Sequence, residues 1–426
     1  MDIKSCEAKK ERVLLAGVHL GLKDVLADTT EESMHELLEL AKTAGAEVVA
    51  TVMQNRPELE SGTYMGEGKL EEISAAIEEL EVDCVIFDDE LSPIQMRNIT
   101  DILGVKVLDR SMLILDIFAM RARSGEGKLQ VELAQLKYRL PRLRGLGVVM
   151  SRTGAGIGTR GPGETKLETD RRHIHSRIKA LSDELEELKK HRELLRSRRK
   201  KDGVITVALV GYTNAGKSTL LNALTDADVF AEDKLFATLD PTSRALELED
   251  GRKVLLVDTV GFIRKLPHHL VEAFKSTLEE AVIADVLVHV VDSSNEEYKN
   301  QITVVDSVLK DIGAIGKPEI VAYNKCDKGD YPETVEVNRD RVNVFISAKK
   351  KSGLDDLIAQ IGELAPGKKK QICVIIPYSE GAVVNDLHTN QKVLGEEYIA
   401  EGTKIKLLAD SITYNRLREY IVEDGE

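Results

Sequence analysis

The stretch Val204-Ile-Thr-Val-Ala-Leu-Val210, continued by Gly211-Tyr-Thr-Asn-Ala-Gly-Lys-Ser218 and the helical run Thr219-Leu-Leu-Asn-Ala-Leu224, decides the fold. It reads as a strand, a glycine loop and a helix, which is the context that the phosphate-binding pattern G-x-x-x-x-G-K-S requires. Glycines let backbone N–H groups close around phosphate oxygens, and the helix N-terminus adds its positive dipole end. Lys217 can then reach the β- and γ-phosphates, while the Ser218 hydroxyl can ligate Mg²⁺.

Three further motifs follow in order, each directly after a strand-like run. Asp258-Thr-Val-Gly261 offers a carboxylate for an outer-shell Mg²⁺ contact and a glycine N–H for the γ-phosphate. In Asn324-Lys-Cys-Asp327, a carboxylate can accept two hydrogen bonds from the ring N–H and amino group of guanine, which adenine cannot supply. The backbone of Ser347-Ala-Lys349 can read the guanine oxygen. Together these motifs predict a site for GTP and GDP, and they disfavour a P-loop ATPase or small-molecule kinase.

The predicted nucleotide contacts are therefore the residues of these four motifs. They are Gly211, Tyr212, Thr213, Asn214, Ala215, Gly216, Lys217, Ser218, Thr219, Asp258, Thr259, Val260, Gly261, Asn324, Lys325, Asp327, Ser347, Ala348 and Lys349.

In this order the motifs resemble those of the translation-factor-related P-loop GTPases, and Leu235–Arg244 looks like the switch I segment of the Obg–HflX branch. The resemblance implies that Thr238 ligates Mg²⁺ when the γ-phosphate is present, so the predicted metal site consists of Ser218, Thr238 and the outer-shell Asp258. It also implies catalytic roles for Lys217, Thr238 and Gly261. It places Asn214 where related GTPases can hold K⁺, and the sequence leaves K⁺ dependence open.

One position departs from many signalling GTPases. There a Gln after the switch II glycine orients the attacking water, whereas this chain has Phe262, which can neither donate nor accept a hydrogen bond. We expect Phe262 to pack against the switch and GTP hydrolysis by the isolated protein to be slow, with a partner accelerating it.

Composition limits the class of protein. The chain has 426 residues, 42% hydrophobic and 31% charged, which is enough for sizeable cores and two to four domains. No run approaches the roughly 18 apolar residues of a membrane span, and Met1–Lys10 lacks the apolar core of a secretory signal. Four widely spaced cysteines are typical of a reduced protein. We therefore expect a cytoplasmic protein without a membrane span, and a monomer.

Charge is distributed unevenly. The net charge is -14, yet residues 121–201 hold 22 Lys and Arg against 10 Asp and Glu. An acidic protein with one basic segment can still bind nucleic acid through that segment.

The order of strand-like and helical runs predicts an α/β protein with four parts. We expect a small, mostly parallel α/β domain over residues 1–115 and a helical hairpin with a glycine-rich basic loop over 116–203. The GTP-binding (G) domain should cover 204–365. A small α+β domain should follow over 366–426, after the linker Pro366–Lys370.

Two leucine- and isoleucine-rich runs predict the hairpin. Their apolar residues are spaced alternately by three and four, which is typical of a heptad seam, and their closeness in sequence favours an antiparallel pair. These residues are Leu129, Leu133, Leu136, Leu140 and Leu143 in the first run and Ile174, Ile178, Leu181, Leu185, Leu188 and Leu195 in the second. Pro141 should kink or end the first helix. A helix from Glu164 to Lys201 would be about 57 Å long.

The loop 144–166 between these helices combines many glycines with Arg144, Arg152 and Arg160, a composition suited to a phosphate backbone. Its Gly156–Gly161 matches a dinucleotide fingerprint, but a charged heptad helix follows instead of a βαβ crossover. The run Gly158–Ile174 closely resembles the signature of the HflX family. Members bind ribosomes, chiefly the large subunit, so the resemblance implies rRNA contact by the basic arm 121–201.

Several alternatives stay open at this point. The basic run Arg196–Lys201 is either a solvated linker or an rRNA contact, and the hairpin could be a structural spacer. Gly66–Lys69 most resembles a helix start, and the alternative is a second nucleotide site in the N-terminal domain. The leading hypothesis is a ribosome-associated GTPase that remodels the ribosome or separates its subunits. The alternative is a GTP-gated switch that binds a protein partner without RNA.

Overall fold

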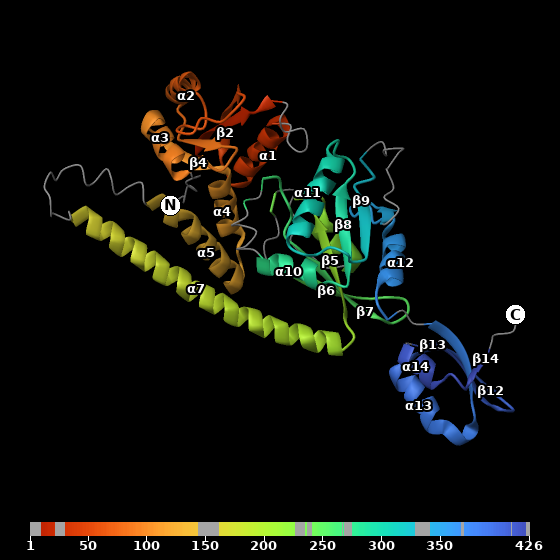
Figure 1. Ribbon diagram of the computed structural model, residues 1–426. Coiled ribbons are helices and arrows are strands. Elements are labelled where there is room, and N and C mark those ends of the chain that lie inside the picture. The colour runs from red at the N-terminus through yellow and green to blue at the C-terminus, as the bar shows by residue number, and fades with distance from the viewer. Residues whose placement is uncertain are drawn as a thin grey trace, which may run out of the picture.

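The structure is a computed structural model. It describes residues 10–21, 30–143, 162–225, 235–236, 241–265, 267, 275–328, 341–367, 370–409 and 411–422. Figure 1 shows three sheets and a long helical hairpin, with the C-terminal sheet set apart at the end of the G domain.

The N-terminal domain is a parallel sheet with helices on both faces, as predicted. Its strands are β1 (Arg12–His19), β2 (Glu47–Asn55), β3 (Cys84–Phe87) and β4 (Lys106–Asp109), in the order β2-β1-β3-β4. The helices are α1 (Thr30–Thr43), α2 (Glu67–Leu80), α3 (Pro93–Leu103) and α4 (Arg110–Arg121). One buried cluster includes residues of α2 and α3, and the other residues of α1 and α4.

Helix ends in this domain follow from local chemistry. Gly66 is the N-cap of α2, which confirms the prediction of a helix start there. Neither α3 nor α4 was predicted. A capping box between Ser92 and Gln95, with Pro93 in the first turn, starts α3. The α4 helix crosses position 115, where the sequence analysis had placed a domain boundary.

The predicted hairpin is present as α5 (Gly125–Arg142) packed against α7 (Pro162–Lys201). Two ion pairs show the direction: Glu126, the earlier residue in α5, pairs with Arg192, the later one in α7, and Glu132 pairs with the earlier Arg177, as an antiparallel arrangement requires. Pro141 lies next to the last residue of α5, so the helix ends where expected.

The heptad seam is shorter than the spacing suggested. Leu181 is fully buried, but Leu195 is 39% exposed, so the predicted register does not continue to Leu195. The reason is that α5 is much shorter than α7, which therefore extends beyond its partner.

The G domain is a six-stranded sheet in the order β10-β9-β8-β5-β7-β6, parallel except for the β6–β7 pair. Its strands are β5 (Ile205–Gly211), β6 (Thr242–Glu247), β7 (Lys253–Asp258), β8 (Val286–Asp292), β9 (Glu319–Asn324) and β10 (Val342–Phe345). Its helices are α8 (Lys217–Thr225), α10 (Lys275–Ile283), α11 (Tyr298–Asp311) and α12 (Leu354–Leu364). In such a sheet, ligands bind at the carboxyl ends of the strands.

The C-terminal domain is a small antiparallel sheet with two helices, in the order β12-β13-β11-β14. Its elements are β11 (Lys370–Ile376), the 3-10 turn η3 (Tyr378–Glu380), α13 (Gly381–Asn390), β12 (Lys392–Ile399), β13 (Gly402–Ala409), α14 (Ser411–Arg416) and β14 (Ile421–Val422). Among the residues that the structure describes, no helix combines the length and apolar character needed to cross a bilayer.

Candidate functional site

The loop between β5 and α8 has the close packing of a phosphate-binding turn. Gly216 has φ +97°, and a Cβ atom there would lie 2.3 Å from Asn324 Nδ2. At Gly261, a Cβ atom would lie 2.8 Å from Thr213 Cα and 3.0 Å from Lys217 Nζ. Only glycine fits both positions, because a side chain at Gly216 would push away Asn324 at the end of β9, and one at Gly261 would separate the phosphate loop from the segment after β7.

Lys217 is buried at the start of α8, with only 6% of its surface exposed. Its ammonium group donates to the carbonyl oxygens of Gly211 at 3.1 Å and Tyr212 at 2.9 Å. Burial lowers the pKa of Lys217 to about 8, and the nearby Asp258 only partly opposes this. A phosphate group would compensate this buried charge, which explains why the site favours a polyanion.

The predicted metal ligands fit a hard cation. Ser218 Oγ donates to Asp258 Oδ2 at 2.6 Å, and Asp258 is fully buried at the end of β7. A hydroxyl and a carboxylate oxygen at this spacing are ligands of the type that Mg²⁺ prefers. The third predicted ligand, Thr238, lies outside the described residues.

The two base-recognition motifs are joined to the phosphate loop. Asn324 donates from Nδ2 to the carbonyl of Ala215 at 2.9 Å and accepts from the Ala348 N–H at 3.0 Å. Lys325 Nζ donates to Asn214 O at 2.9 Å. One asparagine therefore holds three of the predicted motifs together at the ends of neighbouring strands.

Asp327 points its carboxylate toward the next motif. Ser347 Oγ donates to Asp327 Oδ1 at 2.6 Å, and this hydrogen bond lowers the pKa of the Asp327 carboxyl. An ionised carboxylate can accept the two hydrogen bonds that guanine offers.

Asp292 is a site residue that sequence reasoning missed. It ends β8, between the strands of the predicted motifs, and its Oδ2 accepts from Lys325 Nζ at 2.7 Å. Its position after an apolar strand was the available signal, but no motif contains it.

Phe262 is buried, with 2% of its surface exposed, among residues that include Tyr212 and Leu278. Its backbone donates to Gly211 O at 3.1 Å and accepts from Thr213 N at 2.8 Å. The prediction that Phe262 packs rather than orients water is confirmed.

The N-terminal domain packs against both switch segments of the G domain. Phe236 of switch I contacts Phe118 of α4 edge to face, with ring centroids 4.6 Å apart. Val260 and Ile263, after β7, belong to the same buried cluster as Phe118 and the core of α1. Apolar burial therefore joins the two domains where a GTPase changes shape with its nucleotide.

A charged network crosses the same interface. Arg110 is fully buried and pairs with Asp88 at 2.8 Å and with Glu36. Glu36 also accepts from the hydroxyl of Tyr212 in the phosphate loop, and that hydroxyl accepts from the Arg264 N–H at 2.9 Å.

The residues that follow Phe262 complete this network. Lys265 donates to Asp88 at 2.7 Å and lies 2.8 Å from Asp89, while the Arg264 guanidinium pairs with Glu32 of α1. Sequence reasoning found none of these contacts.

The far end of the basic arm contacts α10, the helix that follows switch II. Arg196 Nη2 lies 2.7 Å from Glu280 and its Nη1 3.4 Å from Glu279, and Arg192 lies 3.7 Å from Glu279. We call these pairs the α7–α10 contact. They correct the expectation for Arg196, which is neither a solvated linker residue nor free to bind RNA, because its side chain is only 14% exposed.

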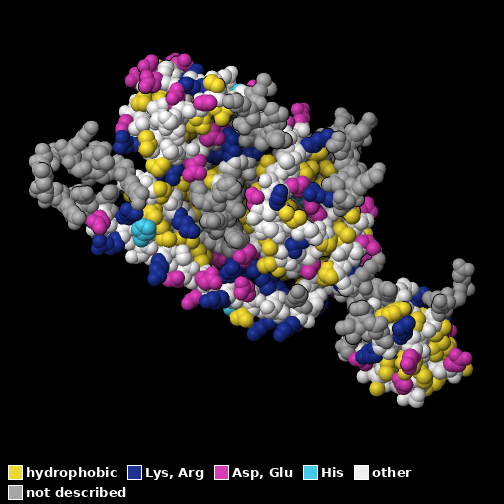
Figure 2. Space-filling view, in the orientation of Figure 1, with side chains coloured by type: hydrophobic (Ala, Val, Ile, Leu, Met, Phe, Trp, Pro, Cys, Tyr) yellow, Lys and Arg dark blue, Asp and Glu magenta, His cyan; other side chains and the backbone are white. Residues whose placement is uncertain are grey.

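The rest of the arm presents charge to solvent. Arg171 and Arg172 are exposed on α7, whereas Arg144, Arg152 and Arg160 of the glycine-rich loop lie outside the described residues. Figure 2 shows dark blue Lys and Arg side chains along α7, interspersed with magenta acidic ones. His173 and His175 are exposed, and His268 and His269 are outside the described residues.

Three family models match the chain in succession. They are described as GTP-binding GTPase N-terminal over residues 31–119, GTP-binding GTPase Middle Region over 121–199 and 50S ribosome-binding GTPase over 206–325.

Curated relatives are similar along most of their length. "GTPase HflX" of Caldanaerobacter subterraneus subsp. tengcongensis is 53% identical over 413 residues, covering 97% of this chain and 94% of that protein. "GTPase HflX" of Escherichia coli is 42% identical, covering 89% and 90%. Among solved structures, a GTP-binding protein from Sulfolobus solfataricus in complex with GDP is 29% identical with a TM-score of 0.43, covering 83% of this chain and 98% of that one.

The pKa of Lys217 predicts a pH dependence of nucleotide affinity. As the pH rises through 8 the empty site loses the Lys217 proton, which must be regained to pair with phosphate, so GTP affinity should fall by about tenfold in all between pH 7 and 9. Fluorescent-nucleotide titration between pH 7 and 9 measures this. Lys217→Arg, whose guanidinium stays protonated, should bind more weakly but without this slope. The same slope in Lys217→Arg would contradict the assignment.

The base pocket predicts a change of specificity. Asp327→Asn replaces the carboxylate acceptor by an amide, so GTP affinity should fall by roughly 100-fold while xanthosine triphosphate binds better. Competitive titration with the two nucleotides tests this. An unchanged affinity for GTP in the variant would show that Asp327 does not contact the base.

Proposed function

This chain belongs to the HflX family of GTPases, and on that premise we propose that it binds the large ribosomal subunit and couples GTP binding and hydrolysis to a rearrangement of the ribosome, including separation of its subunits. It is a GTP-hydrolysing enzyme of a 50S ribosome-binding family. A ribosome-bound role also assigns it to the cytoplasm.

The observation that carries this proposal is the α7–α10 contact. The basic arm is ion-paired to the helix that follows switch II, through Arg192 and Arg196 on one side and Glu279 and Glu280 on the other. A change in switch II on GTP hydrolysis therefore has a direct physical route to the surface that would contact rRNA. The exposed Arg171 and Arg172 on the same helix supply charge for phosphate groups.

At the nucleotide site, we assign Lys217 and the Gly261 N–H to the β- and γ-phosphates. Ser218 and Asp258 would hold Mg²⁺, with Thr238 as a further ligand in the GTP state. When bound, Mg²⁺ neutralises charge on the phosphates. Asn214 remains the position proposed for K⁺.

The residue directly after Gly261 is the buried Phe262, whose side chain has no group that could orient the attacking water. The structure therefore supports slow hydrolysis by the protein alone and acceleration by the ribosome. A group from the ribosome, or a switch segment rearranged on it, would complete the site.

The alternative is a switch that grips a protein partner. Leu194 is 64% and Leu195 39% exposed near the end of α7, so this helix also offers apolar surface. An apolar contact would depend weakly on salt, whereas binding to an RNA backbone depends on it steeply.

The proposal predicts ribosome binding through the arm. Replacing Arg171 and Arg172 by Ala should weaken co-sedimentation with large subunits and flatten its salt dependence by up to about two phosphate contacts. A matched control, Lys299→Ala with Lys310→Ala on α11, removes the same charge away from the arm. Parent-like sedimentation of the arm variant at every salt concentration would favour the protein-switch alternative.

The α7–α10 contact predicts a loss of coupling. Glu280→Arg places like charges beside Arg196, so stimulation of GTP hydrolysis by ribosomes should fall at least about fivefold, the effect of about 1 kcal/mol of coupling. Turnover assays with and without ribosomes measure this, and hydrolysis by the isolated protein should not change. Adding Arg196→Glu to Glu280→Arg should restore stimulation, because it recreates the pair. Full stimulation in the single variant would remove this route.

A further inference from the structure

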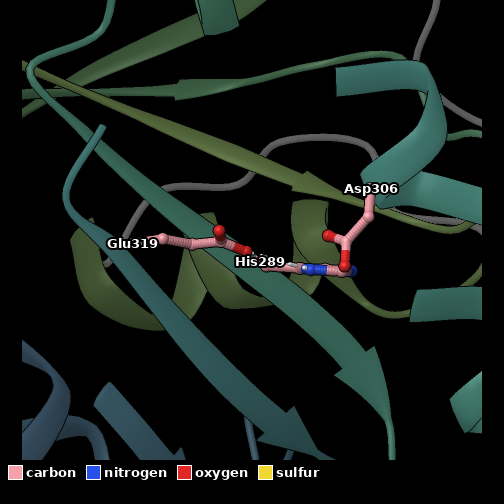
Figure 3. Close-up of side chains that lie close together, drawn as sticks. All are labelled: His289, Asp306 and Glu319. Carbon is pink, nitrogen blue, oxygen red and sulfur yellow. Dashed lines mark ion pairs between the residues drawn. The ribbon is translucent and has the colours of Figure 1, made fainter. Parts of the chain in front are cut away.

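A second cluster of ligand-type side chains lies inside the G domain. His289 in the middle of β8, Asp306 on α11 and Glu319 at the start of β9 each offer one ligand atom, and these atoms lie within 4.8 Å of one another. Figure 3 shows His289 between the two carboxylates. None of the three belongs to the nucleotide motifs.

Three ligand-type atoms of this cluster are buried without a hydrogen bond of good geometry, although Asp306 Oδ1 also lies against the Arg341 guanidinium at 3.0 Å. They are His289 Nδ1, Asp306 Oδ1 and Glu319 Oε1. His289 is only 1% exposed, and its Nδ1 lies 3.3 Å from Glu319 Oε1. Among the described residues, His289 Nδ1 and Glu319 Oε1 face only each other, and burying such polar atoms is costly. A group that accepts electron pairs from both, and from the neighbouring Asp306 carboxylate, would stabilise this arrangement.

Arg341, just before β10, contacts both carboxylates. Its Nε lies 3.3 Å from Glu319 Oε2 and its Nη2 lies 3.0 Å from Asp306 Oδ1. One guanidinium against two carboxylates leaves one negative charge in the cluster. By holding Oε2, Arg341 also leaves Oε1 of Glu319 directed at His289, as outer partners orient the carboxylates of metal sites.

We propose that His289, Asp306 and Glu319 bind a divalent transition-metal ion of the Zn²⁺ class. An imidazole with two carboxylates suits Zn²⁺, whereas Mg²⁺ prefers an all-oxygen set, so this site is chemically distinct from the one beside the nucleotide. Three protein ligands leave a fourth position for water. The Asp306 side chain is 35% exposed, which gives the ion a route from solvent.

Such an ion would connect three elements behind the base pocket. The β8 strand ends at Asp292, which holds Lys325, and β9 ends at Asn324, which holds the phosphate loop. Linking both strands to α11 should therefore raise the thermal stability of the G domain, since a ligand that binds only the folded state stabilises it.

The test uses the full chain, treated with chelator, dialysed and saturated with GDP and Mg²⁺ so that the nucleotide site is filled. Titration with Co²⁺, which reports its ligands by visible absorption, should give one saturable equivalent. Zn²⁺ should displace this ion and raise the Tm. Asp306→Asn should weaken Co²⁺ binding by at least roughly tenfold, while the matched control Asp311→Asn, on the same helix, should bind like the parent.

Because Asp306 is partly exposed, its variant should fold, and unchanged GDP affinity would verify this. Glu319→Gln supplies a second variant with the same expected loss of Co²⁺ absorption. Two results would overturn the proposal: no visible Co²⁺ absorption in the folded parent, or equal Co²⁺ affinity in Asp306→Asn and the parent. Either would mean that ordered water, and not a metal ion, completes the cluster.

Discussion

The two α/β domains depend on one buried guanidinium. Arg110 sits in the N-terminal domain where water cannot reach it, so its charge must be balanced by Asp88 and Glu36. Each of these carboxylates has a second partner in the G domain, Lys265 for Asp88 and Tyr212 for Glu36. The charge balance of one domain is therefore completed by the phosphate loop and switch II of the other. Moving Lys265 would leave Asp88 less compensated, so domain docking and switch conformation cannot vary independently.

The nucleotide site also contains a buried charge that the protein balances only in part. Lys217 is buried against backbone carbonyls, and its main opposite charge among the described side chains is Asp258. Around it the packing is so close that neither Gly216, beside Asn324, nor Gly261, beside Thr213 and Lys217, tolerates a side chain. The site is thus shaped to bind phosphate, yet Phe262 gives it nothing with which to orient water. The isolated protein can therefore bind GTP without hydrolysing it quickly, which suits the proposed stimulation of hydrolysis by a partner.

Sequence reasoning succeeded where chemistry is local. The spacing within Gly211–Ser218 determines a loop geometry by itself, and so the strand, loop and helix were predictable. Contacts between remote residues were not: Glu36 and Tyr212 are 176 positions apart, and no pattern in either segment signals the other. The partner of Arg196 could not be predicted either, because a basic run has the same sequence pattern whether it binds RNA or a glutamate. The alternation of strand-like and helical runs predicted the parallel sheets. It did not predict α4, because this helix begins directly after β4 with no loop between them.

The length of α7 has a mechanical consequence. At 40 residues it is a rod about 60 Å long, paired with the shorter α5 along part of its length and held to α10 near its C-terminal end. If α7 and α5 tilt together about the α10 end they work as a lever: a tilt of about 5° there displaces the opposite end of α7 by about 5 Å. A shift in switch II too small to alter the G domain's own surface would thus become, at the tip, a displacement comparable to one turn of a helix.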